Sequence, residues 1–282
     1  MLGNACMNYF HGNPHYDLRG TIRSESALKL FRSEIRGSLI PNIDIVNEEA
    51  QQALFERERP NVVINCVGLV KQAVGASDLI SSITLNSLLP HQLARQCESH
   101  GSRLVHISTD CVFSGLKRSA YLESDVSDAT DLYGRTKFLG EISTKSNVLT
   151  IRTSYIGNEL EGANGLLEWF LAQSGECQGF TKAIYSGLPT VILLQAIEKV
   201  ILEYPNLSGL YQVASSPISK YNLLQLVAGI FKKQINITPN DGLIINRSLD
   251  GSRFEDTTGF IAPPWEEMVE KMYLDRIANV QK

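Results

Sequence analysis

Short apolar segments alternate with segments of helical periodicity along the first half of this chain. The apolar segments, rich in β-branched residues, span residues 16–23, 39–45, 61–67, 103–108 and 147–152. The segments of helical periodicity, with apolar residues at i, i+3 and i+4, span residues 48–59, 80–100 and 133–145. Repeated alternation of strand and helix is typical of a parallel sheet covered by helices on both faces. The pattern predicts an α/β fold with a doubly wound parallel sheet.

The pattern becomes looser after residue 152, where glycines separate short helical segments. A helix is expected at 190–203, a strand at 209–214, a second helix at 219–232 that begins at Ser219, and a last amphipathic helix after Pro264. We expect residues 1–152 plus about 180–205 to form a nucleotide-binding domain. Residues from about 153–179 plus 206–282 would form a smaller C-terminal α/β lobe that binds substrate.

The N-terminal residues lack the usual opening of such a sheet. The chain runs from Gly3 directly into helix-like sequence, so we expect the first strand and most of a glycine-rich turn to be missing from the given sequence, through a late assigned start or a truncation. If Gly3 is the last glycine of a dinucleotide fingerprint, the residue about twenty positions later meets the adenosine ribose. Arg23 occupies that position and favours a 2′-phosphate; the alternative is a solvated charge at a strand end.

Charge and composition exclude several classes of function. The 282 residues include 26 Lys+Arg and 30 Asp+Glu without a basic cluster, which argues against nucleic-acid and anionic-membrane partners. There is no long apolar segment and no signal-like N-terminus, so we expect a cytoplasmic protein. The five cysteines form no CxxC pair, and His106 lies in an apolar segment typical of a buried core imidazole. We therefore expect no metal site.

The strongest local signal for catalysis is a Tyr-x-x-x-Lys pair, Tyr133 and Lys137, at helical i, i+4 spacing. A phenol can protonate a carbonyl oxygen during hydride transfer if a nearby ammonium lowers its pKa, and we expect Lys137 to do so. Thr109, at the end of the strand over 103–108, is the favoured hydrogen-bond donor to that oxygen, with Ser108 as second choice.

A small, glycine-containing turn follows the strand over 61–67, with the sequence Asn65-Cys66-Val67-Gly68. A dinucleotide crosses the carboxyl ends of the strands at such a turn. Asn86 lies in the helix that follows, and its alternative role is that of an ordinary surface amide.

Several motifs together resemble one family. The segments STDCVFSG (108–115) and YGRTKFLGE (133–141) resemble the extended short-chain dehydrogenase/reductases, specifically the dTDP-4-dehydrorhamnose reductase group. The resemblance continues through IRTSYIG (151–157), GLLEWFL (165–171), YSGLPT (185–190) and GLYQVAS (209–215). It implies a Rossmann-type fold and NADPH-dependent reduction of the 4-keto group of a nucleotide-activated 6-deoxy sugar for surface polysaccharide synthesis, with NADH as an alternative cofactor. The implied partner is a nucleotide sugar, and a homodimer is left open.

The resemblance also assigns roles to residues of this chain. The implied catalytic residues are Thr109, Tyr133 and Lys137. The implied cofactor contacts are Gly3, Arg23, Asp44, Ile45, Asn65, Val67, Gly68, Asn86, Tyr133, Lys137, Arg152, Thr153 and Ser154. The candidate substrate contacts are Ser108, Trp169, Ser186, Gly187 and Arg247, with a core aromatic as the alternative for Trp169.

The departures from related families narrow the reaction. Sugar-nucleotide 4,6-dehydratases carry an Asp-Glu pair after the threonine, whereas here Asp110 is followed by Cys111. This favours simple reduction over dehydration. Two alternatives remain open, namely a sugar-nucleotide epimerase and a non-catalytic NADP-binding regulatory subunit resembling the β-subunit of methionine adenosyltransferase.

Overall fold

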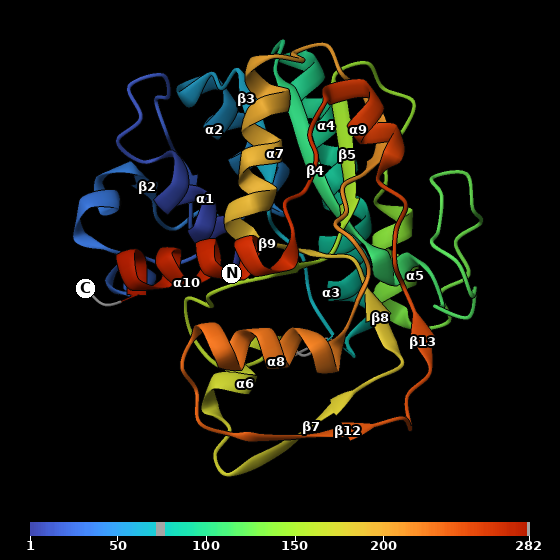
Figure 1. Cartoon of the computed structure of the whole chain (residues 1–282). Coiled ribbons are helices and arrows are strands. Elements are labelled where there is room, and N and C mark those ends of the chain that lie inside the picture. The colour runs from blue at the N-terminus through green and yellow to red at the C-terminus, as the bar shows by residue number, and fades with distance from the viewer. Residues whose placement is uncertain (72–76, 281–282) are drawn as a thin grey trace.

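A four-stranded parallel sheet forms the centre of the molecule (Figure 1). This computed structural model describes residues 1–71 and 77–280. The strand order is β10 (Gly209–Gln212), β5 (Val148–Thr153), β4 (Arg103–Thr109) and β3 (Val62–Asn65), and every neighbouring pair is parallel. The expected α/β fold with a parallel sheet is confirmed.

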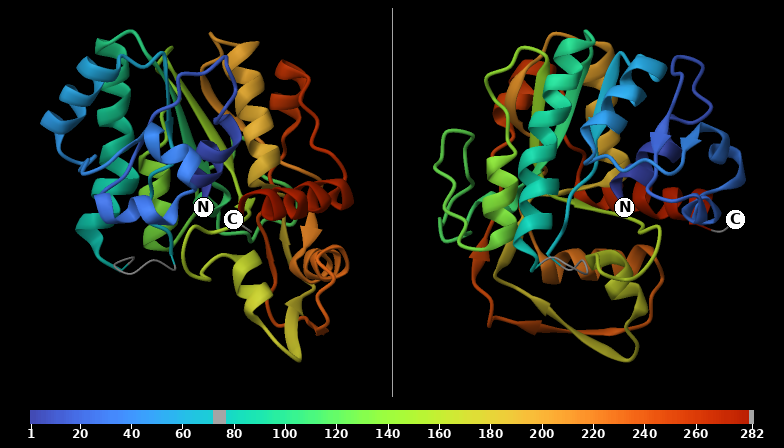
Figure 2. Two further views of the ribbon diagram at one scale, coloured as in Figure 1. Left: turned by 90° about the vertical axis from the view of Figure 1, so that its left-hand side faces the viewer. Right: turned by 180° about the vertical axis from the view of Figure 1, so that it is seen from behind.

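Helices cover both faces of this sheet (Figure 2). Val105 and Leu149 point into a core shared with α1 (Leu2–Phe10) and α7 (Thr190–Leu202). Leu104 and Val148, one residue earlier on each strand, point into a second core with α2 (Glu48–Glu58) and α4 (Leu89–Ser99). Successive side chains of a strand alternate between faces, so continuous apolar strands require a helical layer on each side.

The expected helix over 80–100 is divided into three parts. It consists of α3 (Leu79–Ile83), a π-helical turn (Thr84–Leu88) and α4. Asp78 caps the first part by accepting a hydrogen bond from the amide of Ser81. The π-helical turn carries Asn86 inward, where it is almost fully buried.

Helix α5 (Leu132–Leu139) is shorter than the predicted helix over 133–145. Asp131 caps its first turn through the amide of Gly134, and Gly140 ends it. A side chain at Gly140 would collide with the carbonyl oxygen of Asn86. Only glycine, which has no Cβ, therefore fits at this position.

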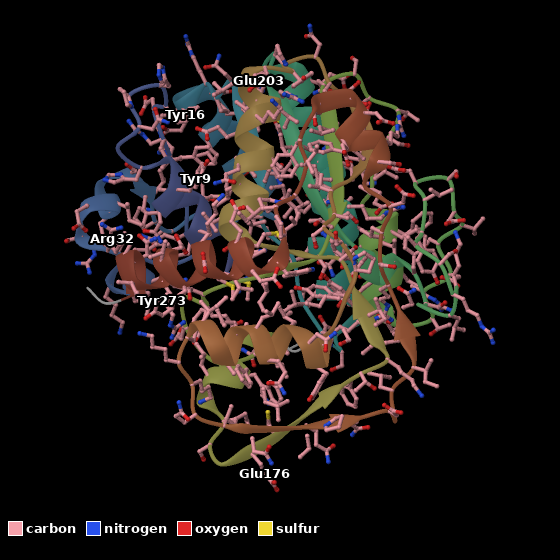
Figure 3. All side chains as sticks on the ribbon, in the orientation of Figure 1. Tyr9, Tyr16, Arg32, Glu176, Glu203 and Tyr273 are labelled. Carbon is pink, nitrogen blue, oxygen red and sulfur yellow. The ribbon has the colours of Figure 1, made fainter. Side chains whose placement is uncertain are left out.

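The N-terminal part contributes a separate two-stranded parallel pair, β1 (Gly20–Thr21) with β2 (Leu39–Ile40). Both strands are shorter than the predicted strands over 16–23 and 39–45, and in the second of these a left-handed Asn42 interrupts the extended backbone. Within the described ranges this pair is not hydrogen-bonded to β3. The hydroxyl groups of Tyr9 and Tyr16, both labelled in Figure 3, donate to Glu198 of α7, which fixes this region against that helix.

A second group of elements lies beside the carboxyl ends of the sheet strands (Figure 1). It contains the parallel pair of β7 (Glu176–Phe180) and β12 (Asn236–Asn240) and the three-stranded group of β11 (Ile218–Ser219), β8 (Ala183–Tyr185) and β13 (Ile245–Asn246). Its helices are α6 (Leu166–Ala172) and α8 (Lys220–Ile230). Ser219 caps α8 through the amide of Asn222, as its position at the predicted start indicates.

The remaining elements connect the two parts. The short strands β6 (Tyr155–Ile156) and β9 (Leu188–Pro189) pair in parallel, while α9 (Ser252–Thr258) and α10 (Trp265–Val280) end the chain. One boundary differs from expectation, since the strand over 209–214, assigned to the second lobe, pairs as β10 with β5 in the central sheet. Its apolar residue Tyr211 completes the core beneath α7, which explains the difference.

Candidate active site

Thr109, Tyr133 and Lys137 lie together at the carboxyl end of β4. Thr109 ends the strand, and α5 approaches so closely that a side chain at Gly134 would collide with the carbonyl oxygen of Cys111. Lys137 is only 5% exposed and donates from Nζ to the carbonyl oxygen of Ile107 at 2.7 Å. A hydrogen bond links Thr109 with Tyr133. The structure therefore brings the three predicted catalytic side chains into one corner.

Burial controls the protonation of Tyr133. Desolvation raises the pKa of the phenol above its ordinary value, and the nearby acidic groups of Cys111, Tyr155 and Asp110 raise it further. Only the hydrogen bond with Thr109 acts in the opposite direction. The expectation that Lys137 lowers this pKa is wrong for the described structure, because removal from water dominates and the Lys137 ammonium bonds to the strand backbone instead.

Desolvation also shifts the pKa of Lys137, but downward instead of upward. Burial lowers the pKa of its ammonium from 10.5 to about 8, while electrostatic interactions with Glu141 and Cys66 partly counter this effect. The side chain is therefore poised to gain or lose its charge near neutral pH.

Next to this group of side chains, Glu141 and Arg152 form a buried ion pair. Glu141 accepts two hydrogen bonds from Arg152, from Nε at 2.9 Å and from Nη2 at 2.6 Å, and a third from Ser108 Oγ at 2.6 Å. Arg152 is 2% exposed, and its guanidinium lies over the ring of Phe113 at 4.9 Å from the centroid. Ser108 and Arg152, predicted as substrate and cofactor contacts, thus bond to Glu141 in the interior.

Thr153 and Ser154 continue from β5 toward the second lobe. Thr153 Oγ1 donates to the carbonyl oxygen of Val213, and the carbonyl oxygen of Ser154 accepts the amide of Leu188. Both residues therefore connect the sheet to neighbouring segments in this structure, next to the carboxyl end of β5.

The turn after β3 is held by two buried amides. Asn65 bonds through Nδ2 to Nδ1 of His106 at 3.1 Å, and its Oδ1 accepts the amide of Val67. His106 is completely buried, as the sequence predicts, and burial holds its pKa well below the usual value. The Asn65 side chain therefore shapes the turn.

Asn86 is the second of these amides. It bonds through Oδ1 to the amide of Leu69, and through Nδ2 to the carbonyl oxygen of Leu69 and to Oγ1 of Thr136. It thereby connects the turn to α5, so the alternative of a surface amide is wrong. A Cβ on Gly68 would lie 3.3 Å from Asn86 Oδ1 and 3.9 Å from Lys137 Nζ.

The residues predicted to contact the adenosine half of the cofactor lie near the ends of β1 and β2 and in α1. Arg23 follows β1 and is exposed, while Asp44 and Ile45 lie in the turn between β2 and α2. Asp44 Oδ1 accepts the amide of Val46 in that turn. Gly3 lies in the first turn of α1, where a Cβ would be 3.6 Å from Cβ of Cys66.

The predicted substrate contacts approach from the second group of elements. Arg247 donates from Nε to the carbonyl oxygen of Phe113 and lies 3.8 Å from Cys111 Sγ. It also interacts with Asp110, whose carboxyl pKa is raised by burial and lowered in part by Arg247. Arg247 therefore lies beside the carboxyl end of β4.

The other predicted substrate contacts differ in how far they are buried. Ser186 is buried and accepts the amide of Leu249, and the carbonyl oxygen of Gly187 accepts a hydrogen bond from Ser215. Trp169 lies on α6 and is 38% exposed, so the alternative of a core aromatic is wrong.

Two residues of this region were not predicted. Glu141 lies within YGRTKFLGE but after the two residues that carry the chemistry, and its contact with Arg152 joins a loop to β5. Tyr185 precedes Ser186 on β8, and its hydroxyl group is buried near Asp110 without a partner among the described residues. An acidic residue so close to Tyr-x-x-x-Lys was the available signal for the first, whereas no sequence pattern marked the second.

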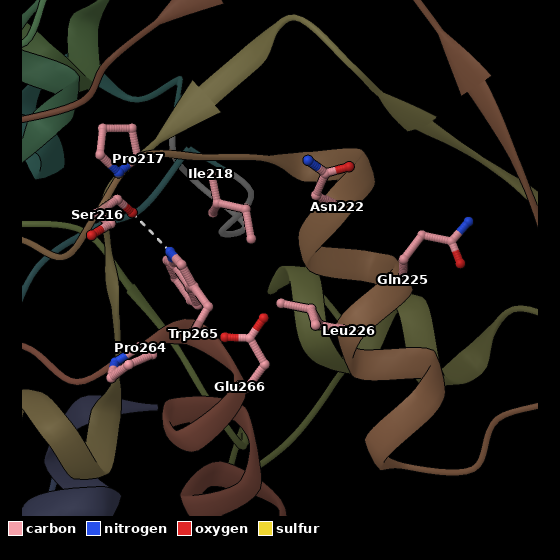
Figure 4. A pocket seen from close by; sticks show the side chains of 9 residues that line it. All are labelled: Ser216, Pro217, Ile218, Asn222, Gln225, Leu226, Pro264, Trp265 and Glu266. Carbon is pink, nitrogen blue, oxygen red and sulfur yellow. Dashed lines mark hydrogen bonds between the residues drawn. The ribbon is translucent and has the colours of Figure 1, made fainter.

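A separate cavity lies away from these residues. It has a volume of about 620 Å³ between the start of α8 and the start of α10 (Figure 4). Its lining includes Trp265, which donates from Nε1 to the carbonyl oxygen of Ser216, together with Asn222 and Glu266. None of the predicted site residues lines it.

No helix within 1–71 and 77–280 combines the length and apolar character needed to cross a membrane. Across the same ranges, no three His, Cys, Asp or Glu side chains are grouped so that they could hold a metal ion.

Comparison with curated proteins identifies several sugar-nucleotide reductases as relatives. The dTDP-4-dehydrorhamnose reductase of Aggregatibacter actinomycetemcomitans is 28% identical over 66% of this chain and 66% of that protein. The corresponding protein of Salmonella typhimurium is 26% identical over 81% of this chain and 84% of its own length. A dTDP-4-keto-6-deoxy-D-glucose reductase of Streptomyces niveus is 34% identical over 36% of this chain. The chain spans just under two thirds of the first of these relatives and 35% of the last.

Solved structures share the fold. A hypothetical dTDP-4-dehydrorhamnose reductase from Sulfolobus tokodaii superposes with a TM-score of 0.75 at 21% identity, covering 94% of this chain and 95% of that one. The Bacillus anthracis dTDP-4-dehydrorhamnose reductase, in complex with NADP, gives a TM-score of 0.73 at 20% identity, covering 84% and 89%. The model of the RmlD substrate binding domain matches residues 23–239, most of the chain. The chain therefore belongs to the RmlD substrate binding domain family, and its resemblance to the dTDP-4-dehydrorhamnose reductases is confirmed.

Proposed function

We propose that this protein reduces the 4-keto group of a nucleotide-activated 6-deoxy sugar with NADPH, as a step in nucleotide-sugar and surface polysaccharide synthesis. The observation that carries the proposal is the convergence of Thr109, Tyr133 and Lys137 at the carboxyl end of β4. The family supports it, since curated relatives include dTDP-4-dehydrorhamnose reductases and a related structure was solved in complex with NADP.

We propose that the dinucleotide lies along the carboxyl edge of the sheet. The turn after β3 has no side chain at Gly68, where a Cβ would lie 3.3 Å from Asn86 Oδ1 and 3.9 Å from Lys137 Nζ, so this turn packs closely against Lys137. Exposed Arg23 follows the end of β1 and offers a guanidinium for a 2′-phosphate. Arg23, Val67, Gly68 and Lys137 would hold the cofactor, which supplies the hydride when bound.

Tyr133 is the proton donor in this proposal. A phenol whose pKa is raised by burial remains protonated at neutral pH, which is the form that reduction requires. The hydroxyl group of Thr109 donates to Asp110 Oδ1 at 3.1 Å in this structure, and in the proposed reaction it would rotate to donate to the same carbonyl oxygen as negative charge develops there. Lys137 has three N–H donors, of which Ile107 takes one, and the others can bind cofactor hydroxyl groups.

The substrate would enter between the sheet edge and the second group of elements. Arg247 lies beside Cys111 and can engage a nucleotide diphosphate, while exposed Trp169 offers a surface for stacking. We propose that Ser186 and Gly187 shape the wall of this site, and that residues 1–152 with about 180–205 serve mainly the cofactor.

The test is ketone-dependent oxidation of NADPH. Purified protein is mixed with NADPH and a dTDP-4-keto-6-deoxy sugar, and the loss of reduced nicotinamide is followed together with the configuration of the product at C4. Oxidation that requires both reactants, with a faster rate for NADPH than for NADH, is the expected result. NADPH binding without oxidation would favour the regulatory-subunit alternative, and a changed sugar configuration without net oxidation would favour the epimerase alternative.

A further inference from the structure

Two cysteines from distant parts of the sequence lie side by side near the candidate active site. Cys6 is on α1 and Cys66 is in the turn after β3, and their sulfur atoms are 3.6 Å apart. Both are free thiols. A Cβ on Gly3 would lie 3.6 Å from Cβ of Cys66, so the first turns of α1 pack directly against this turn.

The two thiols differ in their surroundings. Cys6 is 7% exposed, and its pKa is raised well above the usual value by the hydrogen bond with Cys66 and by burial. Cys66 is half-buried and therefore more accessible from solvent.

We propose that Cys6 and Cys66 form a thiol–disulfide exchange site that accepts a small disulfide such as oxidised glutathione. The thiolate of Cys66 attacks one sulfur atom of the small disulfide, so that a mixed disulfide forms and one small thiolate leaves. That thiolate takes the proton of Cys6, and the Cys6 thiolate then attacks the sulfur of Cys66. The second small thiol leaves, so the protein loses two electrons and the small disulfide gains them.

The two sulfur atoms are already close to bonding distance. Because a disulfide requires a sulfur–sulfur distance of about 2.05 Å, the two sulfur atoms must approach each other by roughly 1.5 Å. Cys66 lies beyond the last residue of β3, so this movement breaks no strand pairing. The resulting bond would tie the middle of α1 to the turn that carries Val67 and Gly68.

The experiment treats the native full chain with excess oxidised glutathione at neutral pH, followed by peptide mapping under non-reducing conditions. The expected main product is a peptide pair linked between Cys6 and Cys66. In Cys6→Ser, a stable glutathione adduct should accumulate on Cys66 because no second thiol can release it. In Cys66→Ser, modification of Cys6 should be at least about tenfold slower, since the remaining thiol is buried.

The matched control is Cys97→Ser, which removes another buried thiol and should leave the linked pair unchanged. Thermal unfolding of each variant verifies that it is folded. The proposal is overturned if the wild-type chain retains a glutathione adduct on Cys66 without the linked pair, or if Cys97 and Cys177 are modified as fast as Cys66.

A second readout concerns the cofactor and rests on the proposed function. NADPH should slow the exchange, since Val67 and Gly68 adjoin Cys66. A linked pair that forms equally fast with and without NADPH would support the exchange site and contradict the placement of the cofactor on this turn.

Discussion

The carboxyl ends of the central sheet and of the separate N-terminal strand pair are built in contrasting ways. At β4 and β5, long buried strands carry Ser108, Thr109 and Arg152 into an interior in which polar groups bond to Glu141 and to each other. At β1 and β2, two-residue strands are followed by exposed Arg23 and Asp44. The proposed proton-transfer groups are thus preorganised by the core, whereas the proposed contacts of the adenosine side depend on exposed side chains.

This difference implies unequal tolerance to substitution. A buried ion pair left without one partner is costly, whereas exposed charges are screened by solvent. We therefore expect changes at the buried end to affect chemistry and stability strongly, and changes at the exposed end to affect only the choice of cofactor.

The largest effect is expected for Tyr133→Phe. This variant keeps the ring but removes the proton donor, so turnover should fall by about 10²- to 10⁴-fold while NADPH binding is largely retained. Steady-state rates and a fluorescence titration measure the two properties separately. The control is Tyr273→Phe on α10 (Figure 3), which should match the wild type. Loss of NADPH binding in Tyr133→Phe would contradict the role of proton donor.

The second effect concerns stability. Glu141→Ala leaves Arg152 buried without its partner and should lower the free energy of unfolding by about 3–5 kcal/mol. Glu98→Ala removes the exposed pair with Lys145 and should cost about 0–1 kcal/mol. Urea unfolding of both variants measures the contrast. Equal losses of unfolding free energy would show that the buried Glu141–Arg152 pair stabilises the fold no more than the exposed Glu98–Lys145 pair does.

The third prediction is a pH dependence due to Lys137. Folding lowers the pKa of its ammonium from 10.5 to about 8, so the unfolded chain binds more protons between these values. The contribution of Lys137 to stability therefore rises with pH through this window, by about 1 kcal/mol per pH unit.

The measurement compares urea unfolding of wild type and Lys137→Met from pH 7 to pH 10. Buried thiols with raised pKa values, such as Cys97, oppose the trend at alkaline pH, so the difference between the two proteins is the informative quantity. A difference that stays constant with pH would contradict the lowered pKa of Lys137.

The smallest effect is expected at the exposed end. Arg23→Ser should weaken NADPH binding by about fivefold and leave NADH binding almost unchanged, because a solvent-exposed guanidinium–phosphate contact contributes about 1 kcal/mol. Titration with both cofactors measures the ratio. Arg19→Ser, just before the opposite end of β1, is the control and should alter neither affinity. Equal weakening of NADPH and NADH by Arg23→Ser would exclude a contact with the 2′-phosphate.

Local patterns predicted the strands of the central sheet and the start of helix α5 well, and their limits are physical. The strands β4 and β5 are buried on both faces, so an unbroken apolar run marks them. The prediction placed the end of α5 too late, because apolar periodicity continues past Gly140, where the helix ends; the close contact that requires glycine there, with the carbonyl oxygen of Asn86, joins residues distant in sequence. β10 was assigned to the wrong part of the fold because its partner, β5, is also distant in sequence.

The candidate site shows the same limit. Asn86 was predicted as a cofactor contact, but its burial and its bonds to Leu69 and Thr136 arise from a π-helical turn that periodicity does not indicate. The pKa of Tyr133 was predicted in the wrong direction because residue spacing shows that an ammonium is near but not how much water is excluded.

The sequence by itself determined the α/β class, the family, and the three residue types that converge at the end of β4, since each follows from short-range periodicity or from motifs. Only the tertiary structure decided the protonation of Tyr133 and Lys137, the burial of the Glu141–Arg152 pair and the contact between Cys6 and Cys66. Desolvation and side-chain contacts depend on which distant segments pack together, and hydrophobic periodicity does not specify those partners.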